Sequence, residues 1–292
     1  MAQKDVELVM TPGEVHWVGD GFRVHNFIPS RSHLERERMD PFILLDYNSE
    51  YEFAPVRKPL GVGVHPHRGF ETVTIAYKGK VEHHDSNGGG GIIGEGDVQW
   101  MTAARGVLHK EFHEREWSEQ GGLFQMVQLW INLPAKFKMS HPRYQAIPNS
   151  EMVRVKLPKD YGFVEVIAGD YEGKRGPAKT FSPVNLMNAR LSQGGKAEFS
   201  FPANYNTALL VVKGAIVINK TEKAPVDHFV LFKNQGDTFE IEATEESVVL
   251  VMSGEPLNEP IVAHGPFVMN TKREIIQAFD DFNQGKFGYL KD

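Results

Sequence analysis

The sequence contains no cysteine. Disulfide bonds, thiolate metal sites and cysteine nucleophiles are therefore excluded together. A bound metal ion would have to use histidine, aspartate, glutamate or backbone oxygen as ligands. The 12 histidines are therefore the side chains to follow first.

A long apolar run and a surplus of positive charge are also missing. No stretch approaches the roughly 18 consecutive apolar residues of a membrane span. The opening MAQKDVELVM has neither the basic run nor the apolar stretch of a signal peptide, so we expect a cytoplasmic protein with no membrane partner. The net charge is −6, from 32 Lys and Arg against 38 Asp and Glu. Because binding a phosphate backbone relies on clustered positive charge, we expect no direct nucleic-acid binding.

Short strands separated by turns are indicated along most of the 292 residues, a length that predicts about two domains. The segments rich in β-branched and aromatic residues are 71–77, 98–103, 124–133, 163–169, 208–219 and 247–254. Gly, Pro, Asn or Asp bounds each of them, which is typical of an all-β sandwich or barrel. The clearest helical pattern covers 272–284, before Gly285, and a short helix or turn is expected within 32–40, before Pro41.

The two halves of the chain repeat one another weakly. Residues 72–79 and 207–214 both begin with Thr and end in a Lys-Gly turn, and a Gly-Asp pair follows each of them, at 96–97 and 236–237. The repeat predicts two copies of one barrel. We place the domains at 1–140 and 141–292, with the join in the proline-containing stretch 136–159.

Six of the histidines fall between positions 65 and 113. His65 and His67 flank Pro66, and because side chains alternate along a strand, both imidazoles should point to the same face. His109 and Glu111 repeat this spacing. If a neighbouring or facing strand carries the second pair, three histidines and one carboxylate converge on one point. The alternative, that a His-x-His pair on a strand is an accident, weakens because a second pair follows.

This set of donors suits a divalent transition ion such as iron, manganese, nickel or copper, because imidazole and carboxylate are intermediate to hard donors and sulfur is absent. Four protein ligands on a metal that prefers six leave two positions for substrate and dioxygen, or water. Zinc is less favoured, because structural zinc usually fills a closed tetrahedral shell with cysteine.

Other polar residues near these pairs have simpler interpretations. His83, His84 and His113 lie in polar, loop-like stretches and are expected to be solvated or to support the ligands from outside. Glu71 shares the strand face of His65 and His67, so it could reach the metal or pair with Arg68 or a strand neighbour.

Two further motifs lie in the same region. The run Gly88–Gly91 indicates a flexible hairpin loop, because neither a Lys-Ser/Thr pair nor a helix follows it as in a phosphate-binding loop. Trp100, Met101, Met126 and Trp130 should be mainly core residues. Gln128 differs from them, because a buried amide needs a partner and could hold a ligand in place.

The segments HPHRGFET (65–72), GDVQWMTAARGVLHKE (96–111) and GPFVMNTKREIIQAFDDFNQGKFG (265–288) together resemble the pirin family of the cupin superfamily. The resemblance runs from residue 40 to the end. It implies a bicupin, that is, two cupin-type β-barrels of the RmlC-like jelly-roll kind with a short C-terminal helix. One divalent metal ion would lie in the N-terminal barrel, Fe(II) being expected, with Mn, Ni, Cu or Zn as alternatives.

The family's motifs also assign the ligands. In pirins the two histidines of the HPH motif and the His and Glu of the LHxE motif hold the metal, which carries over to His65, His67, His109 and Glu111. Because this pattern uses the later glutamate, Glu71 is left out of the ligand set. The internal repeat maps the same four positions to Ser200, Pro202, Val249 and Val251, so the C-terminal barrel is expected to lack metal ligands.

The resemblance implies a quercetin 2,3-dioxygenase activity, in which a flavonol ring is opened by dioxygen with release of carbon monoxide. Glu111 would accept the proton of the flavonol hydroxyl as a general base. The alternative is an iron-containing, redox-responsive regulatory protein that binds a protein partner concerned with transcription or metabolism. A third hypothesis is a metal-free structural bicupin.

Overall fold

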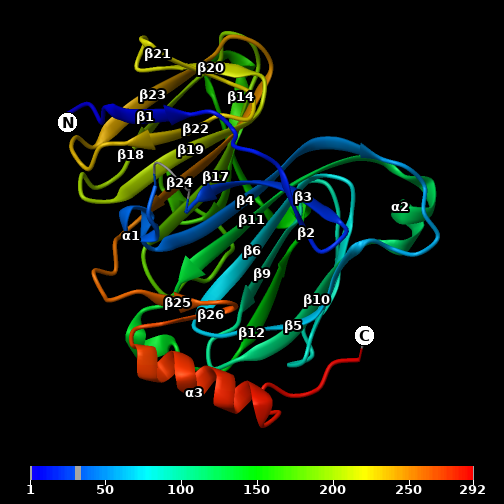
Figure 1. Ribbon diagram of the computed structural model, residues 1–292. Coiled ribbons are helices and arrows are strands. Elements are labelled where there is room, and N and C mark those ends of the chain that lie inside the picture. The colour runs from blue at the N-terminus through cyan, green and yellow to red at the C-terminus, as the bar shows by residue number, and fades with distance from the viewer. Residues whose placement is uncertain (1, 30–33, 292) are drawn as a thin grey trace. The chain divides into compact units, whose positions relative to one another are not determined.

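The structure is a computed structural model that describes residues 2–29 and 34–291. The chain divides into two compact units. One, here called the N-terminal barrel, contains Glu14–Glu37, Phe42–Asn149 and Leu257–Asp292. The other, the C-terminal barrel, contains Met1–Gly13, Arg38–Pro41 and Ser150–Pro256. Each unit pairs a seven-stranded sheet with a four-stranded sheet (Figure 1).

In the N-terminal barrel the seven-stranded sheet has the order β12-β9-β6-β11-β4-β3-β2 and the four-stranded sheet the order β5-β10-β7-β8. The strands are β2 (His16–Val18), β3 (Phe22–Ile28), β4 (Phe42–Phe53), β5 (Gly61–His67), β6 (Phe70–Lys78), β7 (Val81–Asp85), β8 (Gly90–Ile93), β9 (Val98–Thr102), β10 (Val107–His113), β11 (Gly122–Asn132) and β12 (Arg143–Ile147).

In the C-terminal barrel the corresponding orders are β1-β22-β19-β24-β17-β14-β13 and β18-β23-β20-β21. The strands are β1 (Val6–Met10), β13 (Val153–Lys156), β14 (Gly162–Ala168), β17 (Val184–Leu191), β18 (Lys196–Ser200), β19 (Asn206–Lys213), β20 (Ala215–Ile218), β21 (Glu222–Pro225), β22 (Phe229–Phe232), β23 (Thr238–Ala243) and β24 (Ser247–Gly254). Two small hairpins complete the sheets: β15 (Asp170–Tyr171) with β16 (Lys174–Arg175), and β25 (Val262–His264) with β26 (Phe267–Met269).

The units do not follow the chain in the simple order 1–140 and 141–292. Strand β1 pairs with β22, which places the first residues of the chain in the C-terminal barrel. At the other end, Phe267 forms a bridge with Arg68, and the Val268 amide donates to the Arg68 carbonyl at 3.0 Å. The last segment therefore belongs to the N-terminal barrel. These long-range backbone pairings have no local sequence signal.

Most predicted strands are present, namely β6, β9, β11, β14 and β24. The predicted strand at 208–219 is instead two strands, β19 and β20, because the chain turns at Gly214 with φ 75°. Gly79 makes the same turn after β6 with φ 81°. A residue with a Cβ rarely adopts such a φ, so the glycine is what permits the turn.

Helix α3 (Lys272–Asn283) lies where its sequence pattern predicts, and the Thr271 side chain caps its first turn. The Thr271 hydroxyl accepts from the Glu274 amide and donates to the Glu274 carboxylate. Helix α1 (Arg36–Met39) lies inside the predicted range 32–40, of which 32 and 33 fall outside the described residues, and α2 (Arg115–Gln120) was not expected. Within 2–29 and 34–291, no helix is long and apolar enough to cross a membrane.

The matching strand orders make β6 equivalent to β19, β9 to β22, β10 to β23 and β11 to β24. The Lys-Gly turns agree with this equivalence, but the Gly-Asp pairs do not. Gly96-Asp97 precedes β9, whereas Gly236-Asp237 precedes β23, the equivalent of β10. The mapping of His109 and Glu111 to Val249 and Val251 is therefore wrong, because both valines lie on β24.

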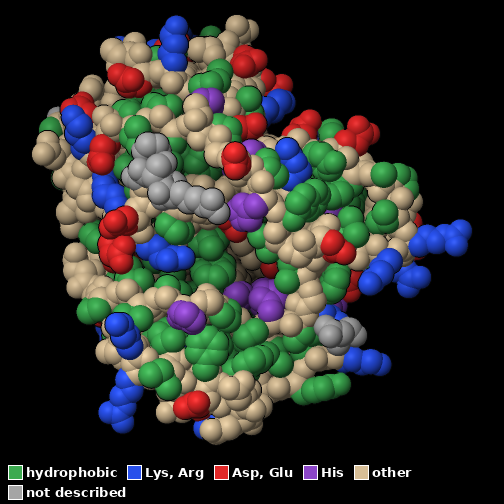
Figure 2. Space-filling view, in the orientation of Figure 1, with side chains coloured by type: hydrophobic (Ala, Val, Ile, Leu, Met, Phe, Trp, Pro, Cys, Tyr) green, Lys and Arg blue, Asp and Glu red, His purple; other side chains and the backbone are tan. Residues whose placement is uncertain are grey.

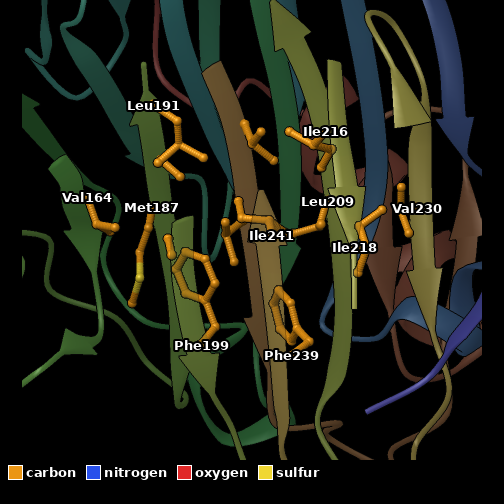
Figure 3. Close-up of a cluster of buried hydrophobic side chains, with 14 of the residues drawn as sticks. Val164, Met187, Leu191, Phe199, Leu209, Ile216, Ile218, Val230, Phe239 and Ile241 are labelled. Carbon is orange, nitrogen blue, oxygen red and sulfur yellow. The ribbon is translucent and has the colours of Figure 1, made fainter. Parts of the chain in front are cut away.

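Strand register gives the correct equivalents. His65 pairs with His109 between β5 and β10, and Phe199 pairs with Phe239 between β18 and β23. Two residues after Phe199, Phe201 takes the place of His67. The predicted equivalents Ser200 and Pro202 are each one residue out of register, and such a slip moves a side chain to the other face. Phe199 and Phe239 are part of the apolar interior of the C-terminal barrel (Figure 3).

Candidate metal centre

Three histidines meet on the inner face of the four-stranded sheet of the N-terminal barrel. His65 and His67 lie on β5, and His109 lies on the adjacent strand β10, directly opposite His65. The ring centroids are 4.1 Å apart for His65 and His109, 4.7 Å for His67 and His109, and 4.9 Å for His65 and His67. One ring nitrogen from each lies within 4.8 Å of the other two. Histidine side chains surround a hollow in the face drawn in Figure 2.

In each of the three imidazoles, Nδ1 lies within hydrogen-bond distance of a group outside the triad. His65 Nδ1 lies 2.8 Å from the Gly63 carbonyl, and His67 Nδ1 lies 3.3 Å from the Pro266 carbonyl. Since a carbonyl oxygen can only accept, these Nδ1 atoms donate, which leaves a lone pair on each Nε2. His109 Nδ1 lies 3.1 Å from Nε2 of His83. In all three rings Nε2 is therefore the nitrogen available to a metal ion.

The Nε2 atom of His109 is buried and has no hydrogen-bond partner among the described residues. A buried nitrogen without a partner is uncommon in proteins, and an ion bound at that point would account for it. Burial lowers the pKa of His65, and it lowers the pKa of His67 and His109 well below the usual value, with repulsion from His65 acting in the same direction. The rings are neutral at neutral pH, the form that binds metal. This triad could hold a divalent metal ion.

Glu111 lies on the same inner face of β10 but outside the group formed by the three histidines. Its carboxylate accepts hydrogen bonds from Gln99 at 2.8 Å, Gln128 at 3.1 Å and Thr74 at 3.2 Å. Burial raises the pKa of Glu111 to about 7, although these hydrogen bonds act against the rise. Gln128 was expected to need a partner and to be able to hold a ligand in place, and the residue to which it donates is Glu111. Thr74 and Gln99 were missed, although both are polar residues within predicted strands.

Glu71 lies away from the three histidines. The Thr102 hydroxyl donates to its carboxylate at 2.6 Å, and the Arg143 guanidinium lies 3.7 Å away. Burial raises the pKa of Glu71 to about 7. Of the alternatives open from the sequence, the structure supports pairing with a strand neighbour. Arg68 pairs with Asp281 instead, at 2.9 Å.

The remaining histidines of the cluster have three different environments. His83 is fully buried and contacts His109. His84 is exposed and lies 2.8 Å from Glu82. His113 is buried among four aromatic rings, and burial lowers its pKa to about 4. The expectation of a solvated or supporting side chain was thus wrong for His113, because strand alternation directs it into the barrel. Gly88–Gly91 lies in the β7–β8 hairpin, as predicted.

An aromatic pair lies beside the triad. Phe70 and Trp130 stack with their ring centroids 4.1 Å apart and an interplanar angle of 26°. Each ring lies 5.0 Å from the ring of His67. Phe70 is buried, whereas Trp130 is only partly buried. Part of the Trp130 side chain is therefore accessible beside the His67 ring.

The C-terminal segment supports the triad from outside. The Pro266 carbonyl holds His67, and Arg68, the next residue, donates to Asp281 of α3 and to the Arg105 carbonyl at 2.6 Å. The Arg68 guanidinium also lies 4.7 Å from the centroid of the Phe287 ring. Residues far apart in the chain therefore hold His67 in place, which no local pattern could have indicated.

Two barrels of this topology, with a histidine triad on the inner face of the first, define a two-domain cupin protein. The family model described as Pirin matches residues 21–131, and the one described as Pirin C-terminal cupin domain matches residues 186–288. The chain belongs to the pirin family.

Individual relatives agree with this assignment. A Pseudomonas aeruginosa protein, provisionally named a quercetin 2,3-dioxygenase, is 45% identical over 93% of this chain and 94% of its own length. A pirin-like protein of Solanum lycopersicum is 37% identical, covering 93% and 89%. A crystal structure described as quercetin 2,3-dioxygenase from Acinetobacter baumannii has a TM-score of 0.93 and 48% identity, covering 99% of this chain and 100% of that chain.

Proposed function

We propose that this protein is a metal-dependent dioxygenase of the quercetin 2,3-dioxygenase type, which opens the ring of a flavonol-like substrate with dioxygen and releases carbon monoxide. The observation that carries the proposal is the convergence of three neutral imidazoles, each with Nδ1 engaged. Two similar proteins bear names for this activity. We propose Fe(II) as the metal, held by His65, His67, His109 and Glu111.

The donor set is compatible with this choice of metal. Three imidazole nitrogens and a carboxylate oxygen, with no cysteine in the chain, suit iron as well as Mn, Ni, Cu and Zn. The three imidazoles and the Glu111 carboxylate would leave a bound divalent ion with a net charge of +1, which would favour binding and ionisation of a flavonol hydroxyl. Four protein ligands would also leave positions for dioxygen.

The aromatic pair beside the triad supports a flat aromatic substrate. Trp130, stacked on Phe70, offers a partly exposed ring 5.0 Å from the His67 ring. Offset stacking on such a ring stabilises a bound aromatic group by about 0.5–1.5 kcal/mol beyond area burial, and it orients the ring. Trp130 would therefore place a flavonol ring beside the metal ligands.

Glu111 supplies the proton acceptor of the proposal. In metal-free protein burial raises the pKa of Glu111 to about 7, so this carboxyl group could accept a proton at neutral pH when it is not bound to the metal. Gln99, Gln128 and Thr74 hold its two oxygen atoms in place. Glu111 is thus proposed both as a ligand and as the general base.

The test is aerobic turnover of several flavonols by iron-loaded protein, with carbon monoxide measured directly. We expect carbon monoxide release that His109→Ala abolishes and that His84→Ala, at the exposed neighbour of His83, leaves unchanged. If loaded protein releases no carbon monoxide from any of the flavonols, while His65→Ala prevents binding of a protein partner, the regulatory hypothesis replaces this one. The cytoplasmic location, the absence of nucleic-acid binding and a protein partner stay predictions.

A further inference from the structure

His83 lies behind the triad, on β7, and differs from the other groups that hold the ligands. The Gly63 and Pro266 carbonyls can only accept the hydrogen bonds of His65 and His67. His83, by contrast, presents Nε2 to Nδ1 of His109 at 3.1 Å, and an imidazole nitrogen either donates or accepts according to its tautomer. The protonation of His109 is therefore tied to that of His83.

Only one arrangement of protons is compatible with a metal on His109. To bind through Nε2, His109 must carry its proton on Nδ1, so Nδ1 donates to His83. His83 must then accept at Nε2 and carry its own proton on Nδ1. If His83 donated instead, the proton of His109 would move to Nε2 and block the metal.

The surroundings of His83 leave its tautomer free but fix its ring. Its Nδ1 atom is buried and has no partner among the described residues, so this nitrogen does not impose a tautomer. The ring stacks on Tyr144, with centroids 5.3 Å apart and planes 7° apart. The Tyr144 hydroxyl donates to Gln99 at 3.4 Å, and Gln99 donates to Glu111. One chain of contacts thus supports both His109 and Glu111.

We propose that His83 is a positioning residue for the metal site: when a metal binds, His83 accepts the Nδ1 proton of His109 and so stabilises the His109 tautomer whose Nε2 is free for the metal. This inference rests on the metal ligands of the proposed function, but not on the reaction. Metal binding and the position of the His83 proton are then coupled. Loading the site selects the tautomer of His83 with the proton on Nδ1.

The first test is titration of metal-free protein with Zn²⁺ alone. In His83→Leu, which cannot accept a hydrogen bond, we expect the Kd to rise about 10- to 100-fold, the usual effect of losing the partner of a ligating histidine. In His83→Gln an amide oxygen can accept the same proton, so most of the affinity should return. The matched control is His84→Leu, at the exposed neighbour bonded to Glu82, which should bind as the unchanged protein does.

The second test needs no variant and therefore does not depend on whether His83→Leu folds. Nitrogen NMR of ring-labelled, Zn²⁺-loaded protein should show His83 neutral, with its proton on Nδ1, and His109 bound through Nε2. A proton on Nε2 of His83 in the loaded protein, or wild-type affinity in a folded His83→Leu, overturns the inference. Since neither test uses a flavonol, failure of turnover with these results intact refutes only the proposed reaction.

Discussion

The two barrels share one strand order but differ in what fills them. In the N-terminal barrel three histidine rings meet, with centroids 4.1–4.9 Å apart. In the C-terminal barrel the same three positions are Phe199, Phe201 and Phe239, with centroids 5.3–6.2 Å apart. Phenylalanine has no atom that can bind a metal. The repeat therefore keeps the geometry of the site in both barrels and its chemistry in one.

The groups around the triad differ in the same way. Strand register shows that each polar residue of the N-terminal barrel has an apolar residue at the equivalent position of the C-terminal barrel. The equivalent positions are Thr74 and Leu209, Gln99 and Val230, Gln128 and Val251, Glu111 and Ile241, and His83 and Ile218. In the C-terminal barrel these equivalents form one hydrophobic cluster (Figure 3). A buried polar residue is tolerated only with partners, so the polar set is kept or replaced as a whole.

The largest expected difference concerns stability. Phe239→Ala should lower the free energy of unfolding by about 3–5 kcal/mol, because it leaves a cavity among packed rings. In metal-free protein, His109→Ala should cost less, about 1–3 kcal/mol, because it removes a smaller, polar ring and one hydrogen bond, from Nδ1 to His83, while Nε2 has no partner to lose among the described residues. Urea unfolding of both variants measures this. Equal losses would mean that the triad is as much a packing element as its aromatic equivalent.

A smaller effect is expected from exchanging one polar residue for its equivalent. Gln99→Val places valine, the residue found at the equivalent position Val230 of the C-terminal barrel, in the N-terminal barrel. It removes the 2.8 Å hydrogen bond from Gln99 to Glu111. We expect the Kd for Zn²⁺ to rise about tenfold, near the lower limit for loss of a group that holds a ligand. Calorimetric titration measures the change, with Val230→Thr in the other barrel as the control. Unchanged affinity would show that Glu111 does not need Gln99.

The smallest effect concerns two buried glutamates, one in each barrel. Burial raises the pKa of Glu71 from 4.5 to about 7, so the folded protein binds more protons than the unfolded chain between these values. Through Glu71, stability therefore falls as pH rises from about 4.5 to 7 and is level above that. Urea midpoints of metal-free protein across this window should show a shallower slope for Glu71→Gln.

The control for this experiment is Glu165, which the Arg154 guanidinium approaches to 3.1 Å and the Arg190 guanidinium to 3.6 Å. Glu165→Gln should lower stability at every pH, because it leaves two arginines without their carboxylate. If Glu71→Gln gave a curve parallel to that of the unchanged protein, Glu71 would not titrate in this window.

Local patterns were sufficient for features that depend on local rules. Strand alternation places His65 and His67 on one face, and the apolar pattern of 272–284 predicts α3, which spans Lys272–Asn283. Gln99 was not recognised as a support, and for His83 a supporting role was only one of two alternatives, because only strand pairing shows that they face Glu111 and His109. The Gly-Asp pairs led to a wrong alignment of the two halves of the chain, because similar turns precede strands that are not equivalent.

Strand alternation and motif spacing are properties of short stretches of chain, so they were enough to indicate an all-β fold and to predict four ligand residues, and the longer motifs were enough to indicate the family. The groups that surround these four residues become visible only once the strands are assembled. Pro266 holds His67 from the far end of the chain, and Phe199 and Phe239 occupy the places of His65 and His109. These relations depend on which strands lie side by side and in what register, and distant backbone hydrogen bonds fix both.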